Sequence, residues 1–305
     1  MKWPKKIRYV LIAALAAIFL LPFSACEKNI SIKTEGAEPV LVVEATIEND
    51  QYPVVILSKS MDYFGKITPE LLFNSFVRGA VVEVSNGVRT HRLKEYTIPL
   101  VGAYSLSYYT VDSANLGTAF KGEINKQYRL TITAEGKNYN ATTTIPVITR
   151  RIDSIWWKPL PAVADSAWAA VMVRATDKPG LGDYIRYFTS VNGAAFLPGD
   201  PSTFDDNIID GSTYEVQVDK GQDRNNLSPD IDHRRFYKRG DTVIFKLSQI
   251  DKETYDFWRT MEFSYSSVGN PFSSPVKVLS NIKGAPALGY FGGYATQFRS
   301  VVIPR

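Results

Sequence analysis

Cysteine is nearly absent from this chain of 305 residues, which contains only Cys26. A lone cysteine excludes an intramolecular disulfide and a metal site built from several thiolates. Any chemical modification of this one thiol would also exclude a cysteine nucleophile. A domain without disulfides is held together by its apolar core, and a chain of this length can bury a core of ample size. The sequence therefore predicts a protein that is stabilised by packing and not by cross-links.

Histidine is almost as scarce, because the sequence contains only His91 and His233. General bases are most often histidines or carboxylates within hydrogen-bond reach of their target. Neither histidine is accompanied by a serine elbow or an acid pattern that indicates a catalytic triad. The sequence also lacks an H-x-x-x-H zinc pairing, a phosphate loop and a dinucleotide fingerprint. We therefore expect a non-enzymatic protein without a cofactor, in which both histidines have surface or structural roles.

The charge of the chain is small and unevenly placed. The formal net charge is +4, and the first 25 residues carry four positive side chains and no acid, namely Lys2, Lys5, Lys6 and Arg8. The rest of the chain is therefore formally neutral. Nucleic-acid binding requires a clustered basic face in the folded domain, so we expect no nucleic-acid partner.

The basic start is followed by an apolar, uncharged run from Tyr9 to Leu21. This run is shorter than the roughly 20 apolar residues that a helix needs to span a bilayer. A basic start, a short apolar segment and small residues before a cleavage site are typical of a secretory signal peptide. The next residues, Phe23-Ser24-Ala25-Cys26, look like a bacterial lipobox, which predicts a signal peptide over residues 1–25 and lipidation of Cys26. The alternative is a plain signal peptide followed by a free cysteine.

Residues 26–39 are expected to form a tether between the lipid anchor and the folded part. Glu27 to Glu38 are short of large apolar groups and are followed by Pro39, a composition that suits a flexible segment. Several acyl chains on Cys26 would anchor the protein stably, whereas a single chain gives marginal binding. The membrane is therefore one expected partner.

Short β-type runs with turn signals between them follow the tether. A strong hairpin signal, Asn86-Gly87, separates two of them, because both residues tolerate a positive φ. About seven strands are expected in the first half, a number typical of an immunoglobulin-like β-sandwich, and they cover residues 40–47, 54–57, 80–84, 88–93, 103–111, 128–133 and 139–145. We therefore predict this sandwich over residues 40–147.

The second half, residues 148–305, is predicted to be another β-rich domain with one short helix near residues 250–263. Ser248 or Asp251 can cap this helix, and apolar residues recur at helical spacing after them. Gly292-Gly293 is expected to separate the last two strands. The strands expected in this domain are 152–157, 167–175, 184–191, 213–218, 242–247, 288–291 and 296–303. The fold class is thus mainly β, with two domains.

One acidic segment is a candidate metal site. Asp200, Asp205, Asp206 and Asp210 fall in a short segment that is expected to be a loop, and calcium prefers several oxygen ligands of this kind. The spacing does not match a calcium-loop motif, so a solvated turn is the expectation and calcium the alternative. A carboxylate pair for glycoside hydrolysis is defined by its spatial separation, and the sequence favours no particular two.

Aromatic residues are plentiful, with 17 Tyr, 16 Phe and 5 Trp. Aromatic faces stack on sugar rings and anchor protein interfaces. Tyr63, Phe64, Trp156 and Trp157 are the candidates for exposed positions. β-sandwich cores also use aromatic residues, so we expect most of the others in the core.

Several short motifs resemble an uncharacterised Bacteroidota outer-membrane lipoprotein family, domain of unknown function 4249, along nearly the whole chain after Cys26. They are Pro39–Ala45, Gly240–Val243, Ile250–Phe257, Gly269–Phe272, Asn281–Ala285 and Ala287–Phe291. Members of this family are typically encoded beside TonB-dependent outer-membrane receptors. The resemblance therefore implies a lipid-anchored accessory of such a receptor in the outer membrane, on the cell surface in preference to the periplasmic face. It implies no catalytic residues.

The resulting expectation is a non-enzymatic lipoprotein that captures a ligand, such as a glycan, a peptide or another nutrient, or caps the receptor. Two other classes stay open. A fimbrial or adhesive subunit could share the lipid anchor and the two β domains, but it would need a removable first strand and a donor strand. A secreted hydrolase would be revealed by a screen of peptide and glycan substrates.

Overall fold

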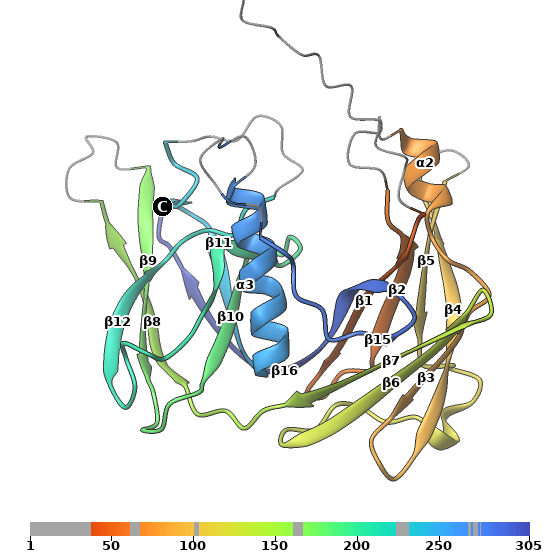
Figure 1. Cartoon of the computed structure of the whole chain (residues 1–305). Helices are drawn as coiled ribbons and strands as arrows, with labels where there is room; N and C mark the ends of the chain where they lie inside the picture. Colours follow the sequence, from red (N-terminus) through yellow and green to blue (C-terminus); the bar gives the residue numbers. More distant parts are fainter. Residues whose placement is uncertain are drawn as a thin grey trace, which may run out of the picture. The chain divides into compact units, whose positions relative to one another are not determined.

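The computed structural model describes residues 38–61, 68–100, 104–160, 167–223, 232–267, 270, 274 and 276–305 (Figure 1). The predicted signal peptide, Cys26 and the tether up to residue 37 lie outside the described residues, as do Tyr63 and Phe64. Residues Glu38–Arg305 cluster as one unit. None of the described helices is long and apolar enough to span a membrane.

Strands make up most of the first half, and each buries alternate residues because successive side chains of a strand point to opposite faces. In β6, for example, Tyr128, Leu130 and Ile132 are buried. The elements are β1 (Leu41–Glu48), β2 (Val54–Lys59), α2 (Pro69–Asn74), β3 (Val81–Ser85), β4 (Thr90–Pro99), β5 (Ser105–Thr110), the 3-10 turn η1 (Leu116–Thr118), β6 (Lys126–Ala134) and β7 (Lys137–Ile145). The predicted hairpin at Asn86-Gly87 joins β3 to β4.

The second half is also built mainly from strands and adds one longer helix. Its elements are β8 (Arg151–Pro159), β9 (Trp168–Thr176), β10 (Tyr184–Val191), β11 (Leu197–Phe204), β12 (Thr213–Val218), β13 (Tyr237–Lys238), β14 (Thr242–Ile250), α3 (Lys252–Ser267), β15 (Lys283–Gly284) and β16 (Ala287–Val302). The predicted fold class, mainly β with one longer helix in the second half, is confirmed.

Twelve strands form one hydrogen-bonded sheet in the order β11-β10-β14-β16-β1-β2-β5-β4-β3-β6-β7-β15. β1 and β16 pair in parallel, from Leu41 opposite Ala287 to Glu48 opposite Tyr294. Gly289 lies opposite Val43 with a φ of +96°, and a Cβ atom there would lie 1.9 Å from the carbonyl oxygen of Val43. Only glycine fits this position, so the parallel pair depends on it.

The second sheet contains β8, β9, β12 and β13, and β9 pairs with each of the other three. Its buried side chains, such as Val171 and Val173, form one core cluster with Val243, Phe245 and Leu247 of β14. The strands of the first half enclose a separate core, which includes Val43, Leu57, Val82, Leu130 and Ile132. Each half therefore has its own apolar core.

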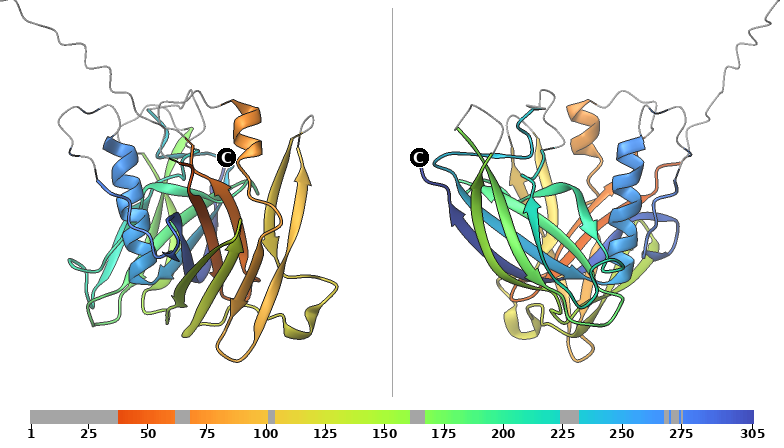
Figure 2. Two further views of the ribbon diagram at one scale, coloured as in Figure 1. Left: turned by 45° about the vertical axis from the view of Figure 1, so that its right-hand side comes forward. Right: turned by 90° about the vertical axis from the view of Figure 1, so that its left-hand side faces the viewer.

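The helix α3 confirms the predicted helix and lies beside β10, β11 and β16 (Figures 1 and 2). Asp251 caps it, because its Oδ1 accepts a hydrogen bond from the backbone N–H of Thr254 at 2.9 Å. The other carboxylate oxygen of Asp251 accepts from the Thr143 hydroxyl at 2.6 Å and from the Thr144 N–H at 2.8 Å. One side chain therefore connects the start of α3 to β7.

The prediction of two closing strands separated by Gly292-Gly293 is wrong, because β16 runs through both glycines without a break. A Cβ atom at Gly293 would lie 2.4 Å from the carbonyl oxygen of Thr144, and one at Gly292 would lie within 3.0 Å of two tyrosine rings. The glycines therefore do not interrupt the strand. They allow neighbouring groups to approach it closely, which is a known reason for glycine inside strands.

The expectation of a loop at Asp200 is also wrong, because Asp200 lies in β11. Pro198, Gly199 and Pro201 disfavour strands, which explains why the sequence did not indicate this one. β11 is the edge strand of the large sheet, and proline is tolerated at an edge because the missing N–H would not have bonded a neighbour.

The predicted domain boundary between residues 147 and 148 falls in the connection from β7 to β8. β16 serves both halves: it pairs with β1 on one side and with β14 on the other. Its Phe291 and Ala295 belong to the first core, and Val301 packs against the second. The division into two domains stays a prediction.

Candidate ligand cavity

A cavity of about 630 Å³ lies between the two sheets of the second half. Pairs of residues two positions apart on four strands point into it, as the two-residue period of strands requires. These pairs are Val173 and Ala175 on β9, Ile185 and Tyr187 on β10, Val216 and Val218 on β12, and Phe245 and Leu247 on β14. The volume and the apolar lining are those of a pocket for a small molecule.

The charged residues that line this cavity include Asp200, Asp205, Asp219 and Arg235. Arg235 and Asp219 form an ion pair of 2.6 Å, and both are shared with a neighbouring depression of about 280 Å³. Asp205 accepts a hydrogen bond of 3.1 Å from the hydroxyl of Tyr255. Burial and the Asp205 carboxylate raise the pKa of Tyr255 to about 12, so this tyrosine stays protonated and remains a donor.

Arg150 also lines the cavity, and its side chain is 0% exposed. Its Nε donates to Asp177 at 3.0 Å, and both Nη atoms are buried without a hydrogen-bond partner within the described part of the chain. The backbone around it is fixed, because its N–H donates to Gln249 and its carbonyl oxygen accepts from Gln297. A buried cation with unpaired donors is rare and therefore marks a functional candidate.

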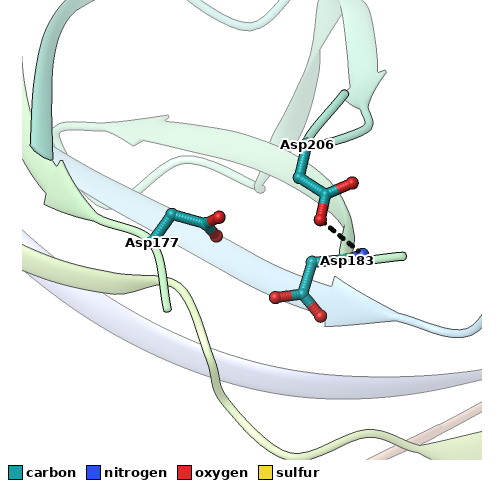
Figure 3. A group of neighbouring side chains, drawn as sticks. All are labelled: Asp177, Asp183 and Asp206. Carbon is teal, nitrogen blue, oxygen red and sulfur yellow. Dashed lines mark hydrogen bonds between the residues drawn. The ribbon is translucent and has the colours of Figure 1, made fainter. Parts of the chain in front are cut away.

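Three aspartates lie close together beside Arg150, and Figure 3 shows them with the hydrogen bond from the backbone nitrogen of Asp183 to the Asp206 carboxylate. They are Asp177, Asp183 and Asp206, with one carboxylate oxygen of each within 4.8 Å of the others. Backbone N–H groups of Gly182 and Asp183 donate to Asp206, and that of Gly211 donates to Asp177. The cluster thus joins the turn after β9 to the segment after β11.

The Asp183 carboxyl of this cluster has a raised pKa. Burial raises its pKa, the neighbouring Asp177 and Asp206 act in the same direction, and the hydrogen bond from the Thr149 hydroxyl and the charge of Arg150 oppose them. Carboxylate oxygens at this spacing are also the ligands that a hard cation prefers. Because each of the three carboxylates accepts a hydrogen bond within the chain, the cluster is already stable as a structural network.

The four aspartates considered for calcium are separated in the structure. Only Asp206 belongs to the cluster, while Asp210 accepts a hydrogen bond from the N–H of Gly180 and Asp205 accepts from Tyr255. Asp200 lines the cavity instead. Sequence reasoning missed Asp177, Asp183 and Arg150, since none of them falls in a motif with a recognisable spacing.

The two histidines lie far apart in the sequence and have different surroundings. His91 is buried, its Nδ1 is 2.8 Å from the Thr118 hydroxyl, and its Nε2 accepts the N–H of Asp112 at 3.3 Å. His233 stacks on Trp168 with the ring centroids 4.3 Å apart. Neither histidine lines the cavity.

The aromatic candidates Trp156 and Trp157 are half-buried on β8. Cations lie over both rings: Lys158 Nζ is 5.6 Å from the ring centroid of Trp156, and the Arg239 guanidinium is 4.5 Å from that of Trp157. Trp157 also packs against the core of the second half. These contacts give both residues a structural role.

The fold and the cavity together define a β-rich protein with an apolar cavity between its two sheets. The chain belongs to the family described as Domain of unknown function (DUF4249), whose model matches residues 27–300. The predicted resemblance to domain of unknown function 4249 is thereby confirmed. A search of the curated proteins gave no match.

Proposed function

We propose that this protein is a lipid-anchored lipoprotein of the outer membrane that captures a small, largely apolar ligand for a TonB-dependent receptor, without catalysing a reaction. The observation that carries the proposal is the cavity of about 630 Å³ between the sheets. Its size and apolar lining suit a ligand, and the charged residues at Asp200, Asp219 and Arg235 can orient a polar end.

The composition of the cavity supports binding in preference to catalysis. Its lining contains no histidine, cysteine, serine or lysine among the described residues, and the acid–base groups that it does contain are carboxylates and tyrosines. Two of the carboxylates that line it already have partners, since Asp219 pairs with Arg235 and Asp205 accepts a hydrogen bond from Tyr255.

The proposals of a lipid anchor and of a receptor partner are based on the sequence. The lipobox at Phe23–Cys26 and the tether over residues 26–39 predict attachment to a membrane. The Bacteroidota family that the chain resembles is typically encoded beside TonB-dependent receptors. The cell surface is the proposed side of the membrane, where a ligand can be collected before the receptor transports it.

Affinity purification of the tagged full chain from gently solubilised outer membranes tests the receptor. We expect a TonB-dependent receptor in stoichiometric amount, identified by mass spectrometry, and no such enrichment with an unrelated tagged lipoprotein. Recovery of the chain alone would contradict the receptor partnership. Recovery with copies of itself, seen as a ladder on a gel without full denaturation, would favour a fimbrial subunit.

The anchor has a separate test in the Cys26→Ser variant. Because the serine hydroxyl is not lipidated, we expect this variant in the soluble fraction and the wild type in the membrane fraction after cell lysis. Equal amounts of both in the membrane fraction would refute lipid attachment at Cys26.

A further inference from the structure

The feature that points beyond a general binding role is the guanidinium of Arg150. A guanidinium carries five N–H donors, and Arg150 uses one of them, the Nε–H, on Asp177. Nη1 and Nη2 are buried and have no hydrogen-bond partner among the described residues. A buried donor that is left unpaired is costly, so a group that accepts from these atoms would stabilise the protein.

The backbone of Arg150 is held in place by two side chains from neighbouring strands. The N–H of Arg150 donates to the Gln249 side chain of β14, and its carbonyl oxygen accepts from the Gln297 side chain of β16. The side chain then extends into the space between the sheets, where Arg150 lines the cavity together with Ala175, Ile185 and Tyr214. The unpaired donors therefore belong to a residue of the cavity lining that has apolar residues beside it.

The charges around Arg150 decide what kind of acceptor fits. Asp177 already pairs with the guanidinium, and Asp183 and Asp206 lie in the same cluster as Asp177, so three carboxylates lie near one cation. Along the cavity itself, Asp200, Asp205 and Asp219 outnumber Arg150 and Arg235. A carboxylate or phosphate ligand would meet like charge at both places, and like charge raises the free energy of binding.

We infer that the cavity binds an apolar molecule with one uncharged oxygen acceptor, of the ketone, ester or amide class, and that this oxygen accepts hydrogen bonds from Nη1 and Nη2 of Arg150. The inference rests on the proposed role in ligand capture and adds the class of ligand. Solvent does not reach either Nη atom, so entry of the oxygen requires a lining side chain to shift. Tyr214 lines the cavity and lies within electrostatic reach of Arg150, and it is the side chain that we expect to move.

A competition assay tests this inference. The fluorescent apolar probe 1-N-phenylnaphthylamine is bound to the purified full-length lipoprotein in nanodiscs and then displaced by competitors, with protein-free nanodiscs as the blank. The competitors are 2-octanone, n-octane and octanoate, which have the same chain length and differ in the polar end. We expect 2-octanone to bind on the order of tenfold more tightly than n-octane, as a hydrogen bond to a charged group predicts, and also more tightly than octanoate at neutral pH.

Two variants assign the preference to one side chain. Arg150→Met should remove the preference for 2-octanone over n-octane, because a methionine has no N–H group to donate. Arg174→Met, which changes an arginine outside the cavity lining that pairs with Glu215 on the surface, should leave the preference intact. Arg150→Met removes the partner of Asp177 and could therefore prevent folding. In that case the inference is tested by the relative affinities of the three competitors for the wild type.

Three results would overturn the inference. Equal binding of 2-octanone and n-octane would mean that the guanidinium is not reached, for example because water satisfies it. Tightest binding of octanoate would make the site an anion site. If neither the probe nor any of the three competitors binds, the cavity does not bind an apolar ligand of this kind. The receptor partnership is measured separately by co-purification, so it can stand or fall independently of these results.

Discussion

Replacement of Asp251 by alanine should destabilise the protein strongly, because this one carboxylate has two structural roles. Its Oδ1 caps α3 by accepting the N–H of Thr254, and its Oδ2 accepts from the hydroxyl and the N–H of Thr143 and Thr144 on β7. Loss of an N-cap costs about 1 kcal/mol. Each unpaired donor on β7 adds roughly 1–3 kcal/mol, less where water can replace the lost acceptor. We therefore expect a loss of about 3–4 kcal/mol in the free energy of unfolding.

The Asp251→Asn variant separates the two roles. An asparagine keeps one side-chain oxygen as an acceptor, and asparagine caps helices about as well as aspartate. Its amide nitrogen cannot accept from Thr143 or Thr144, so only the bridge to β7 is weakened. We expect its stability to lie between those of the wild type and Asp251→Ala.

Urea unfolding followed by tryptophan fluorescence measures these differences as shifts in the midpoint at constant m-value. The matched control is Asp256→Ala in the same helix, where the carboxylate pairs with Lys252 at 2.5 Å on a partly exposed surface. Such a pair contributes about 0.5 kcal/mol or less. If Asp251→Ala were no more destabilised than Asp256→Ala, the assignment of both roles to Asp251 would be refuted.

Two further predictions concern pH and backbone packing. Burial lowers the pKa of His91 from its ordinary value of 6.5, so the unfolded state takes up this proton at a higher pH than the native state does, and the native state loses stability as the pH falls below about 6.5. The melting temperature of the wild type should therefore fall more between about pH 7 and about pH 5 than that of His91→Gln, and parallel profiles would contradict this. Gly289→Ala should destabilise the fold by more than about 3 kcal/mol or prevent folding, because its Cβ would lie 1.9 Å from the Val43 carbonyl oxygen. Gly87→Ala also has a positive φ but meets no atom within 4 Å, so its cost should stay near 1 kcal/mol, and equal melting temperatures for the two variants would refute the argument from close approach.

Local patterns were sufficient to predict most of the fold. The β-type runs at residues 184–191 and 213–218 predicted β10 and β12 with the bounds that the structure has. The predicted α3 followed from the cap at Asp251 and the helical spacing after it. β11 was missed because its prolines and glycine disfavour strands, and only its position at a sheet edge makes them acceptable.

The cavity could not be predicted because it is a product of tertiary packing. Its walls come from β9, β10, β12 and β14, whose apolar residues are indistinguishable in sequence from those of a filled core. Arg150 follows a predicted domain boundary and is adjacent to Arg151, and two neighbouring basic residues suggest an exposed linker. Its burial depends on Asp177, and no local pattern connects the two residues.

The parallel pair of β1 and β16 has a consequence for how the protein folds. The two strands are separated by almost the entire described chain, so their contact requires closure of a very long loop and raises the contact order, which slows folding. Until β16 arrives, β1 presents an unpaired edge beside apolar residues, and such edges recruit other chains. Synthesis delivers β1 first and β16 last, so the interval of greatest risk of aggregation extends until the final strand has emerged.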